Sequence, residues 1–172
     1  MLKILGCIVI LTASSAAGFI YGESFKRRVI DLRELQRIIH LLQSEIEYKC
    51  NPIPRALKEL SSKTTEPFSI IFNEISELLS KNQVESVYEA FKIIFNSNNH
   101  QTSLNKDDIN ILLDLSKSLG ESDVSGQRKM FELSLESIKK QIILAEGLMY
   151  KNLKVYRYLG VTLGSMIIIM LI

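Results

Sequence analysis

Both ends of this chain are almost purely apolar, and no other feature limits its possible folds so strongly. The run from Ile4 to Tyr21 comprises 18 residues and has no charged side chain. The run from Tyr158 to Ile172 also has no charged side chain. As a helix the first run is about 27 Å long, close to the thickness of a bilayer core. The last run reaches a similar length if it starts at Val155 and Arg157 snorkels to the headgroups. We therefore predict a transmembrane helix at each end.

The flanking charges predict how the two helices are oriented. Basic residues follow the first apolar run and precede the last one: Lys26, Arg27, Arg28, Lys151, Lys154 and Arg157. Positive charge favours the cytoplasmic side of a membrane helix. The expected organisation is a first transmembrane helix at residues 1–22, a cytoplasmic domain at residues 23–152 and a second transmembrane helix at residues 153–172. Both termini are then extracytoplasmic, and the protein is a two-pass component of the cell membrane.

The apolar ends have two other interpretations, a cleaved signal peptide and a buried core helix. The first run could be a cleaved signal peptide, because the small residues of "ASSAAG" resemble a cleavage site. A signal peptide carries its positive charge in front, whereas here only Lys3 precedes the run, so the charges favour retention. Either run could instead be a buried core helix. Each is apolar all round, however, and the middle of the chain has enough apolar stripes to bury itself.

Small residues recur at four-residue spacing inside both predicted membrane helices. Gly160 and Gly164 form one row, and Ser14, Gly18 and Gly22 form the other. Such rows let two helix backbones approach closely in lipid. We expect the membrane helices to pack on each other or on those of a partner, although small residues are also generally common in membrane helices.

The middle of the chain has the apolar spacing of helices and no clear strand pattern, so the predicted fold class is all-α, a bundle of about six helices. Its first helix carries a coiled-coil-like 3-4-3-4 seam made by Leu32, Leu35, Ile39, Leu42 and Ile46. The last helix is expected to begin near Val124 and to run unbroken into the C-terminal membrane helix, over some 70 Å.

Capping residues predict where the shorter helices begin and end. Asn51 is the expected N-cap of a second helix with Pro52 in its first turn, and Thr65 is the expected N-cap of a third. A fourth helix is expected from about Val84, and Asn105 should cap a fifth. Gly120 is expected just after the fifth helix, with positive φ.

Catalytic and metal-binding motifs are not recognisable in the sequence. Phosphate-binding loops, C-x-x-C and H-E-x-x-H are missing, so we predict no cofactor, no metal site and no catalytic residue. His40 fits a packing role, and Glu45 and Glu47 face different sides of a helix. A net charge of +2 does not favour nucleic acid as a partner. The two cysteines fit a reducing compartment.

Several stretches together resemble the stage III sporulation protein AB family. They are "LRELQRIIHLLQSEIEYKCNPIPRAL", "YEAF" and "LLDLSKSLGESDVSGQ", in an order that spans nearly the whole chain together with the two apolar ends. Phe91 departs from the tryptophan expected in many relatives, but it keeps an aromatic ring there.

This resemblance implies a helical domain similar to the cytoplasmic domain of the type II secretion inner-membrane platform protein. It also implies a place in the mother-cell membrane, within a channel-like complex that joins mother cell and forespore. The implied partners are a secretion-type ATPase, stage III sporulation protein AA, the other proteins of the complex, and further copies of the chain itself. By the same analogy seven residues are turn or docking elements: Glu45, Tyr48, Pro52, Leu119, Gly120, Asp123 and Gln127.

Three functions follow as hypotheses. The first is a non-enzymatic membrane scaffold of a secretion-like complex required for endospore formation, which docks the ATPase. The alternative is a membrane-bound signalling module that transmits motion through long dimeric helices, but the short outer tails leave no sensing domain. A membrane-anchored hydrolase is third, because it needs a cluster of polar groups that the sequence does not indicate.

Overall fold

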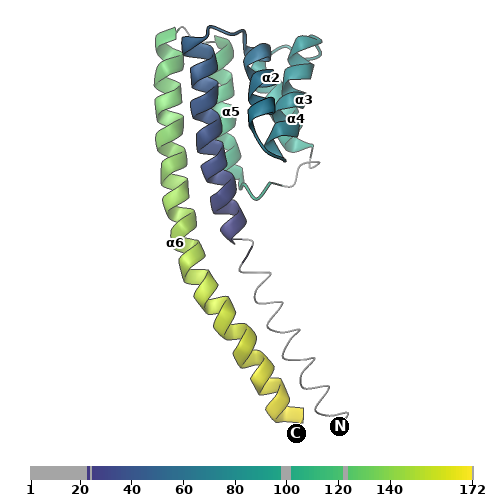
Figure 1. Ribbon diagram of the computed structural model, residues 1–172, viewed down its shortest axis with the longest axis vertical. Helices are drawn as coiled ribbons and strands as arrows, with labels where there is room; N and C mark the ends of the chain where they lie inside the picture. Colours follow the sequence, from purple (N-terminus) through teal and green to yellow (C-terminus); the bar gives the residue numbers. More distant parts are fainter. Residues whose placement is uncertain (1–22, 24, 98–101, 122–123, 172) are drawn as a thin grey trace. The chain divides into compact units, whose positions relative to one another are not determined.

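The computed structural model describes residues 23, 25–97, 102–121 and 124–171, and every element within them is helical. A helix over residues 25–43 continues as a π-helical turn, η1 (Ser44–Tyr48). It is followed by α2 (Ile53–Lys63), α3 (Phe68–Ser80), α4 (Val87–Asn96), α5 (Lys106–Glu121) and α6 (Val124–Leu171) (Figure 1). The predicted all-α class is confirmed.

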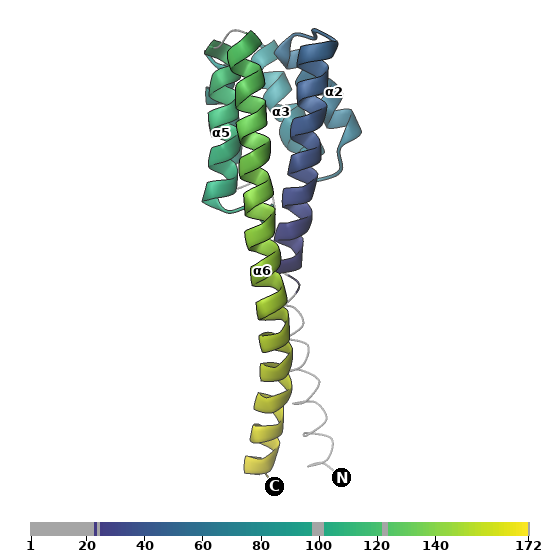
Figure 2. The same ribbon diagram turned by 90° about the vertical axis from the view of Figure 1, so that its left-hand side faces the viewer.

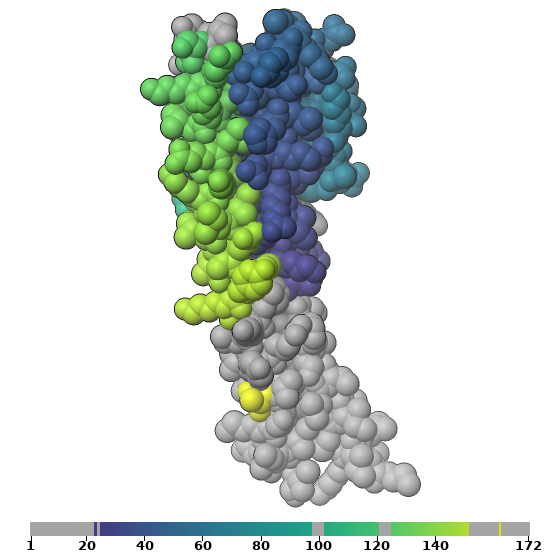
Figure 3. Space-filling model, turned by 60° about the vertical axis from the view of Figure 1, so that its left-hand side comes forward, coloured from purple at the N-terminus to yellow at the C-terminus, as the bar shows by residue number. Residues whose placement is uncertain are grey.

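The chain divides into two compact units, Asp31–Ile142 and the remainder, which combines Met1–Ile30 with Ile143–Ile172. Within the first unit, α2 packs on α3, α3 on α4, and α4 on α5. The helix over residues 25–43 and the first part of α6 lie side by side and run in opposite directions (Figures 1 and 2). Figure 3 shows these two helices on one face of the molecule, in blue and green.

The core of this unit is aliphatic along the first helix and aromatic at its centre. The predicted seam residues Leu32, Leu35, Ile39 and Leu42 are all buried. Four phenylalanines with at most 1% exposure fill the middle: Phe68, Phe72, Phe91 and Phe131. The rings of Phe72 and Phe91 meet edge to face with centroids 6.1 Å apart, a favoured aromatic geometry. Each fully buried phenylalanine contributes about 2–3 kcal/mol by area burial.

The seam prediction fails at its last position, where Glu45 is buried and Ile46 is only half-buried. The π-helical turn that begins at Ser44 explains the difference. A π-turn has a wider repeat than an α-turn, so residues beyond its start are rotated away from the positions that a 3.6-residue period predicts. The predicted alternation therefore holds to Leu42 and is lost after it.

The predicted cap of α5 is confirmed as a reciprocal pair. The backbone N–H of Asp108 donates to Asn105 Oδ1 at 2.8 Å, and the N–H of Asn105 donates to Asp108 Oδ2 at 3.0 Å. A side-chain cap also starts α4, where the N–H of Glu89 donates to Ser86 Oγ at 3.1 Å. Helix α4 consequently begins at Val87, three residues after the predicted start.

Two other predicted caps are displaced. Pro52, not Asn51, is the N-cap of α2, because the Asn51 side chain is engaged elsewhere, by Glu45. Pro67, not Thr65, is the N-cap of α3, and the Thr65 carbonyl accepts a hydrogen bond from the N–H of Ser69. Proline suits both positions because it has no N–H group, and the first N–H groups of a helix have no acceptor within the helix.

Helix α6 is unbroken from Val124 to Leu171, so the predicted continuity of the last helix is confirmed. Gly160 and Gly164 lie within α6, whereas Ser14, Gly18 and Gly22 lie outside the described residues. In the part of the chain that the structure describes, no helix combines the length and the hydropathy needed to cross a membrane.

Gly120 corrects another prediction, because it lies inside α5 and does not have a positive φ. The helix continues one residue further, so the left-handed turn predicted at this glycine is not needed. A Cβ atom at this position would meet only Val87 Cγ2, at 4.0 Å, an ordinary van der Waals contact.

We therefore expect Gly120→Ala to stabilise the protein by about 0.5 kcal/mol, since alanine is favoured over glycine in helices. Chemical unfolding of the full chain in mild detergent, followed by circular dichroism, measures this change. A loss of stability would instead indicate a left-handed backbone at this position.

Candidate functional site

The end of the first long helix buries a carboxylate. Glu45 is 2% exposed, and its carboxylate accepts three hydrogen bonds. Lys49 Nζ donates at 2.7 Å, Asn51 Nδ2 at 2.8 Å and Lys63 Nζ at 2.5 Å. The backbone N–H of Asn51 also donates to the Glu45 carbonyl at 3.1 Å. We call these four side chains the Glu45 cluster. It joins η1 to the last residue of α2.

The electrostatics of the Glu45 cluster favour the ionised carboxylate. Hydrogen bonds from Lys49 and then Lys63 lower the pKa of Glu45 to about 2, while burial acts in the opposite direction. The same contact raises the pKa of Lys63 above its ordinary value. A buried charge needs such compensation, since an unpaired carboxylate in the interior is strongly unfavourable. The cluster therefore has a structural role, which is to hold α2 against the end of the first helix.

Arg37 adds a second tie between the same two helices. Its Nη2 donates to the Lys63 carbonyl at 3.0 Å, so a cation binds the C-terminal end of α2. Cations are favoured there because the last carbonyl groups of a helix lack partners within the helix. Arg37 also pairs with Glu34, and this hydrogen bond lowers the pKa of the Glu34 carboxyl.

Glu47 has different partners from Glu45, as expected from their spacing. Its carboxylate accepts a hydrogen bond from Gln43 Nε2 at 3.1 Å and lies 3.7 Å from Arg128 Nε of α6. Tyr48, at the end of η1, is 81% exposed. Cys50 follows in a left-handed conformation with φ of 50° and carries an exposed free thiol. His40 is exposed on the first helix, and His100 lies outside the described residues.

The connection between α5 and α6 is closed by a side chain. Gln127 Nε2 donates to the Leu119 carbonyl at 3.3 Å, and the Leu119 side chain is 3% exposed. Asp123, which the resemblance makes a turn or docking element, lies outside the described residues. Leu119 and Gln127 thus come together, and both fix the connection.

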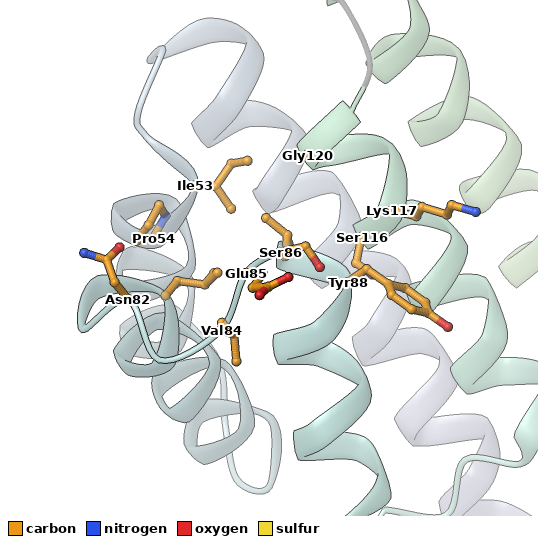
Figure 4. A pocket seen from close by; sticks show the side chains of 12 residues that line it. Ile53, Pro54, Asn82, Val84, Glu85, Ser86, Tyr88, Ser116, Lys117 and Gly120 are labelled. Atoms are coloured by element: carbon orange, nitrogen blue, oxygen red, sulfur yellow. The ribbon is translucent and has the colours of Figure 1, made fainter.

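A pocket of about 470 Å³ lies between the start of α2, the connection from α3 to α4, and the C-terminal part of α5. Figure 4 shows the side chains around it. Its lining is partly apolar and partly polar: Ile53, Pro54, Leu79, Asn82, Val84, Glu85, Ser86, Val87, Tyr88, Ser116, Lys117 and Gly120. Of these residues, only Gly120 was among the predicted turn or docking elements.

Helix caps form two borders of this pocket. Helix α3 ends in a Schellman motif, in which the N–H of Gln83 donates to the Leu78 carbonyl and the N–H of Asn82 donates to the Leu79 carbonyl. Asn82 has the left-handed φ of 50° that this motif requires. Ser86 then caps the start of α4 by accepting from the N–H of Glu89, and the Glu89 carboxylate accepts from the N–H of Glu85. The asparagine and the serine in "KNQVES" are typical of a helix end and a helix start, so they could have indicated these two caps. The prediction that the fourth helix begins at Val84 missed them.

Across residues 23, 25–97, 102–121 and 124–171, no three His, Cys, Asp or Glu side chains are arranged to hold a metal ion. Two further hollows of about 450 Å³ each lie among the described residues, one between α2 and α3 and one on the first helix beside His40.

A family model described as stage III sporulation protein AB matches residues 3–172. The chain belongs to this family. It is 28% identical over 171 residues to stage III sporulation protein AB of Bacillus subtilis (strain 168), with 99% of each chain covered. A solved structure of stage III sporulation protein AB is also similar, with a TM-score of 0.63 and 23% identity, covering 72% of this chain and 96% of that one. At this identity the solved structure supports the fold alone.

The stability of the folded chain should depend on the ionised form of Glu45. We expect Glu45→Gln to lower the free energy of unfolding by about 2 kcal/mol at pH 7, because charged hydrogen bonds are lost from a buried site. The folded pKa of about 2 lies below the ordinary value of 4.5. The contribution of Glu45 is therefore fully present above pH 4.5 and is lost as the pH falls towards 2.

Urea unfolding of both proteins between pH 7 and pH 2.5 checks this expectation, and the difference between them should narrow only below about pH 4.5. Glu77→Gln is the matched control, because Glu77 also pairs with a lysine, Lys81, but its side chain is 49% exposed. It should have a much smaller effect. Equal effects of the two substitutions would show that the Glu45 cluster has no special role.

Proposed function

We propose that this chain is a non-enzymatic, membrane-anchored scaffold in a secretion-like complex required for endospore formation, and that its helical unit docks a cytoplasmic secretion-type ATPase. Family membership over residues 3–172 is the observation that carries the proposal. The relative from Bacillus subtilis is aligned over 99% of its own length, and its name connects that relative with sporulation.

The support for the two membrane anchors comes from the sequence. Apolar runs at residues 1–22 and 153–172 with basic flanks on their inner sides support two membrane helices and a cytoplasmic middle. The continuity of α6 through residues 153–171 is compatible with this topology, because a membrane helix must satisfy all of its backbone hydrogen bonds internally. By resemblance, the membrane is that of the mother cell.

A scaffold role is supported by what the buried polar side chains do. Glu45 holds η1 to α2, and Asp108 caps α5. Ser76 Oγ of α3 donates to the Pro54 carbonyl of α2 at 2.8 Å, and Ser118 Oγ donates to the Leu115 carbonyl at 2.8 Å. Glu45 and Ser76 thus join different elements, whereas the hydrogen bonds of Asp108 and Ser118 stay within α5 and its cap. Such a bundle offers other proteins a fixed surface.

The proposed partners come from the family resemblance. They are the ATPase, stage III sporulation protein AA, on the cytoplasmic side, and the other proteins of the stage III complex in the membrane. Further copies of the chain are also proposed partners, through the rows that contain Gly18 and Gly160. Docking an ATPase requires a surface that faces the cytoplasm, and the unit Asp31–Ile142 would supply it.

Co-purification tests the docking proposal. A tagged full-length chain isolated in mild detergent from sporulating cells should bring the ATPase with it, while an unrelated two-pass membrane protein with the same tag should not. Recovery of the other complex members without any ATPase, under conditions in which the ATPase is present in the extract, would contradict docking.

A further inference from the structure

We propose that the pocket between α2, α4 and α5 is the docking point for the cytoplasmic partner. We infer that it receives one apolar side chain of that partner, flanked by a basic and an acidic residue. This inference rests on the proposed function and adds to it the surface that is used and the chemistry of the segment that binds there.

The position of the pocket within its unit is the first argument. Helix α5 contributes Ser116, Lys117 and Gly120, all close to its C-terminal end. The first long helix and α6 are antiparallel, and α6 starts at the same end of the unit where α5 finishes (Figures 1 and 2). The pocket therefore lies at the end of the unit Asp31–Ile142 where α5 finishes and α6 begins, and a soluble partner can reach it there.

The lining provides a place for an apolar anchor. Ile53 and Pro54 come from the start of α2, Val84 from the connection before α4, and the Tyr88 ring from the first turn of α4. A volume of about 470 Å³ lies within the range of ligand pockets. Protein interfaces gain much of their affinity from a single apolar or aromatic side chain seated in such a pocket.

The charges at the pocket specify what flanks the anchor. Glu85 belongs to the connection before α4, and Lys117 belongs to α5 (Figure 4). As far as the structure describes the chain, neither the Glu85 carboxylate nor the Lys117 ammonium group takes part in a hydrogen bond or an ion pair. Two opposite charges at different sides of one pocket can each attract an opposite charge on a partner. They would fix the direction in which the partner's segment lies across the pocket.

The pocket is also held in shape before any partner arrives. The Schellman motif at Asn82 fixes the end of α3, and the hydrogen bonds that Ser86 and the Glu89 carboxylate accept fix the start of α4. Ser116 Oγ donates to the Leu113 carbonyl at 2.7 Å within α5. A preformed site loses little conformational entropy on binding. These caps make the pocket a suitable contact point for a partner.

Binding of purified stage III sporulation protein AA to the full-length chain in nanodiscs tests the proposal. The variant Glu85→Lys with Lys117→Glu reverses both charges and keeps the net charge, and it should weaken binding at least tenfold. Lys129→Glu with Glu132→Lys makes the same two changes at exposed positions of α6, and it should change the dissociation constant less than twofold.

A second pair of variants tests the apolar anchor independently of charge. Gly120→Leu should fill part of the pocket and weaken binding at least tenfold, while Gly147→Leu, the same change at an exposed glycine of α6 outside the pocket, should bind like the unmodified chain. Circular dichroism and thermal unfolding verify that each variant is folded. If the unmodified chain binds and both pocket variants have dissociation constants within twofold of its own, this inference is overturned but the proposed function is not. A failure of the unmodified chain to bind at all would overturn the proposed function, and this inference with it.

Discussion

The burial of one carboxylate is the interaction on which the rest of the helical unit depends. Glu45 reaches the interior because the first long helix widens into a π-helical turn at Ser44, and two lysines together with Asn51 compensate its charge. The contact with Lys63 holds the end of α2, and Arg37 binds the carbonyl of the same residue. Once α2 is held there, α3 can pack on it, and Ser76 can reach the Pro54 carbonyl. The position of α2 and α3 thus follows from a polar contact that adds to the apolar seam.

Much of the fold could be predicted from periodicity and capping chemistry, because both are local properties of the sequence. The seam from Leu32 to Leu42, the cap at Asn105 and the start of α6 at Val124 are cases of this kind. The burial of Glu45 could not be predicted, because it depends on a π-turn and on Lys63, which is 18 residues further along the chain. Asn51 was predicted as a cap for a sound local reason, but a contact with the buried Glu45, six residues earlier, determines its role. Gly120 is a third case, since the helix extends past it.

The pocket also could not be predicted from local sequence patterns. Its walls come from three separate parts of the chain, around Ile53, Val84 and Lys117, and no local motif connects them. The sequence supplied the caps at Asn82 and Ser86, but only the packing of α4 on α5 places them beside Gly120. Family membership and the basic flanks of the apolar ends suggest where the unit works, and the pocket suggests how it meets a soluble partner. The proposed role of the helical unit is that of an adaptor between the membrane and an ATPase.

This account requires above all that the helical unit lies on the cytoplasmic side of the membrane, and the natural thiol at Cys50 can report this directly. Cys50 is exposed and free, so a Cys7→Ser variant would carry a single cysteine in the cytoplasmic unit and none in the predicted membrane helices. A membrane-impermeant maleimide is added to intact protoplasts and, separately, to inside-out membrane vesicles that contain this variant. The account predicts labelling of Cys50 in the inside-out vesicles and none in intact protoplasts. Labelling in intact protoplasts, or recovery of the chain in the soluble fraction, would contradict it.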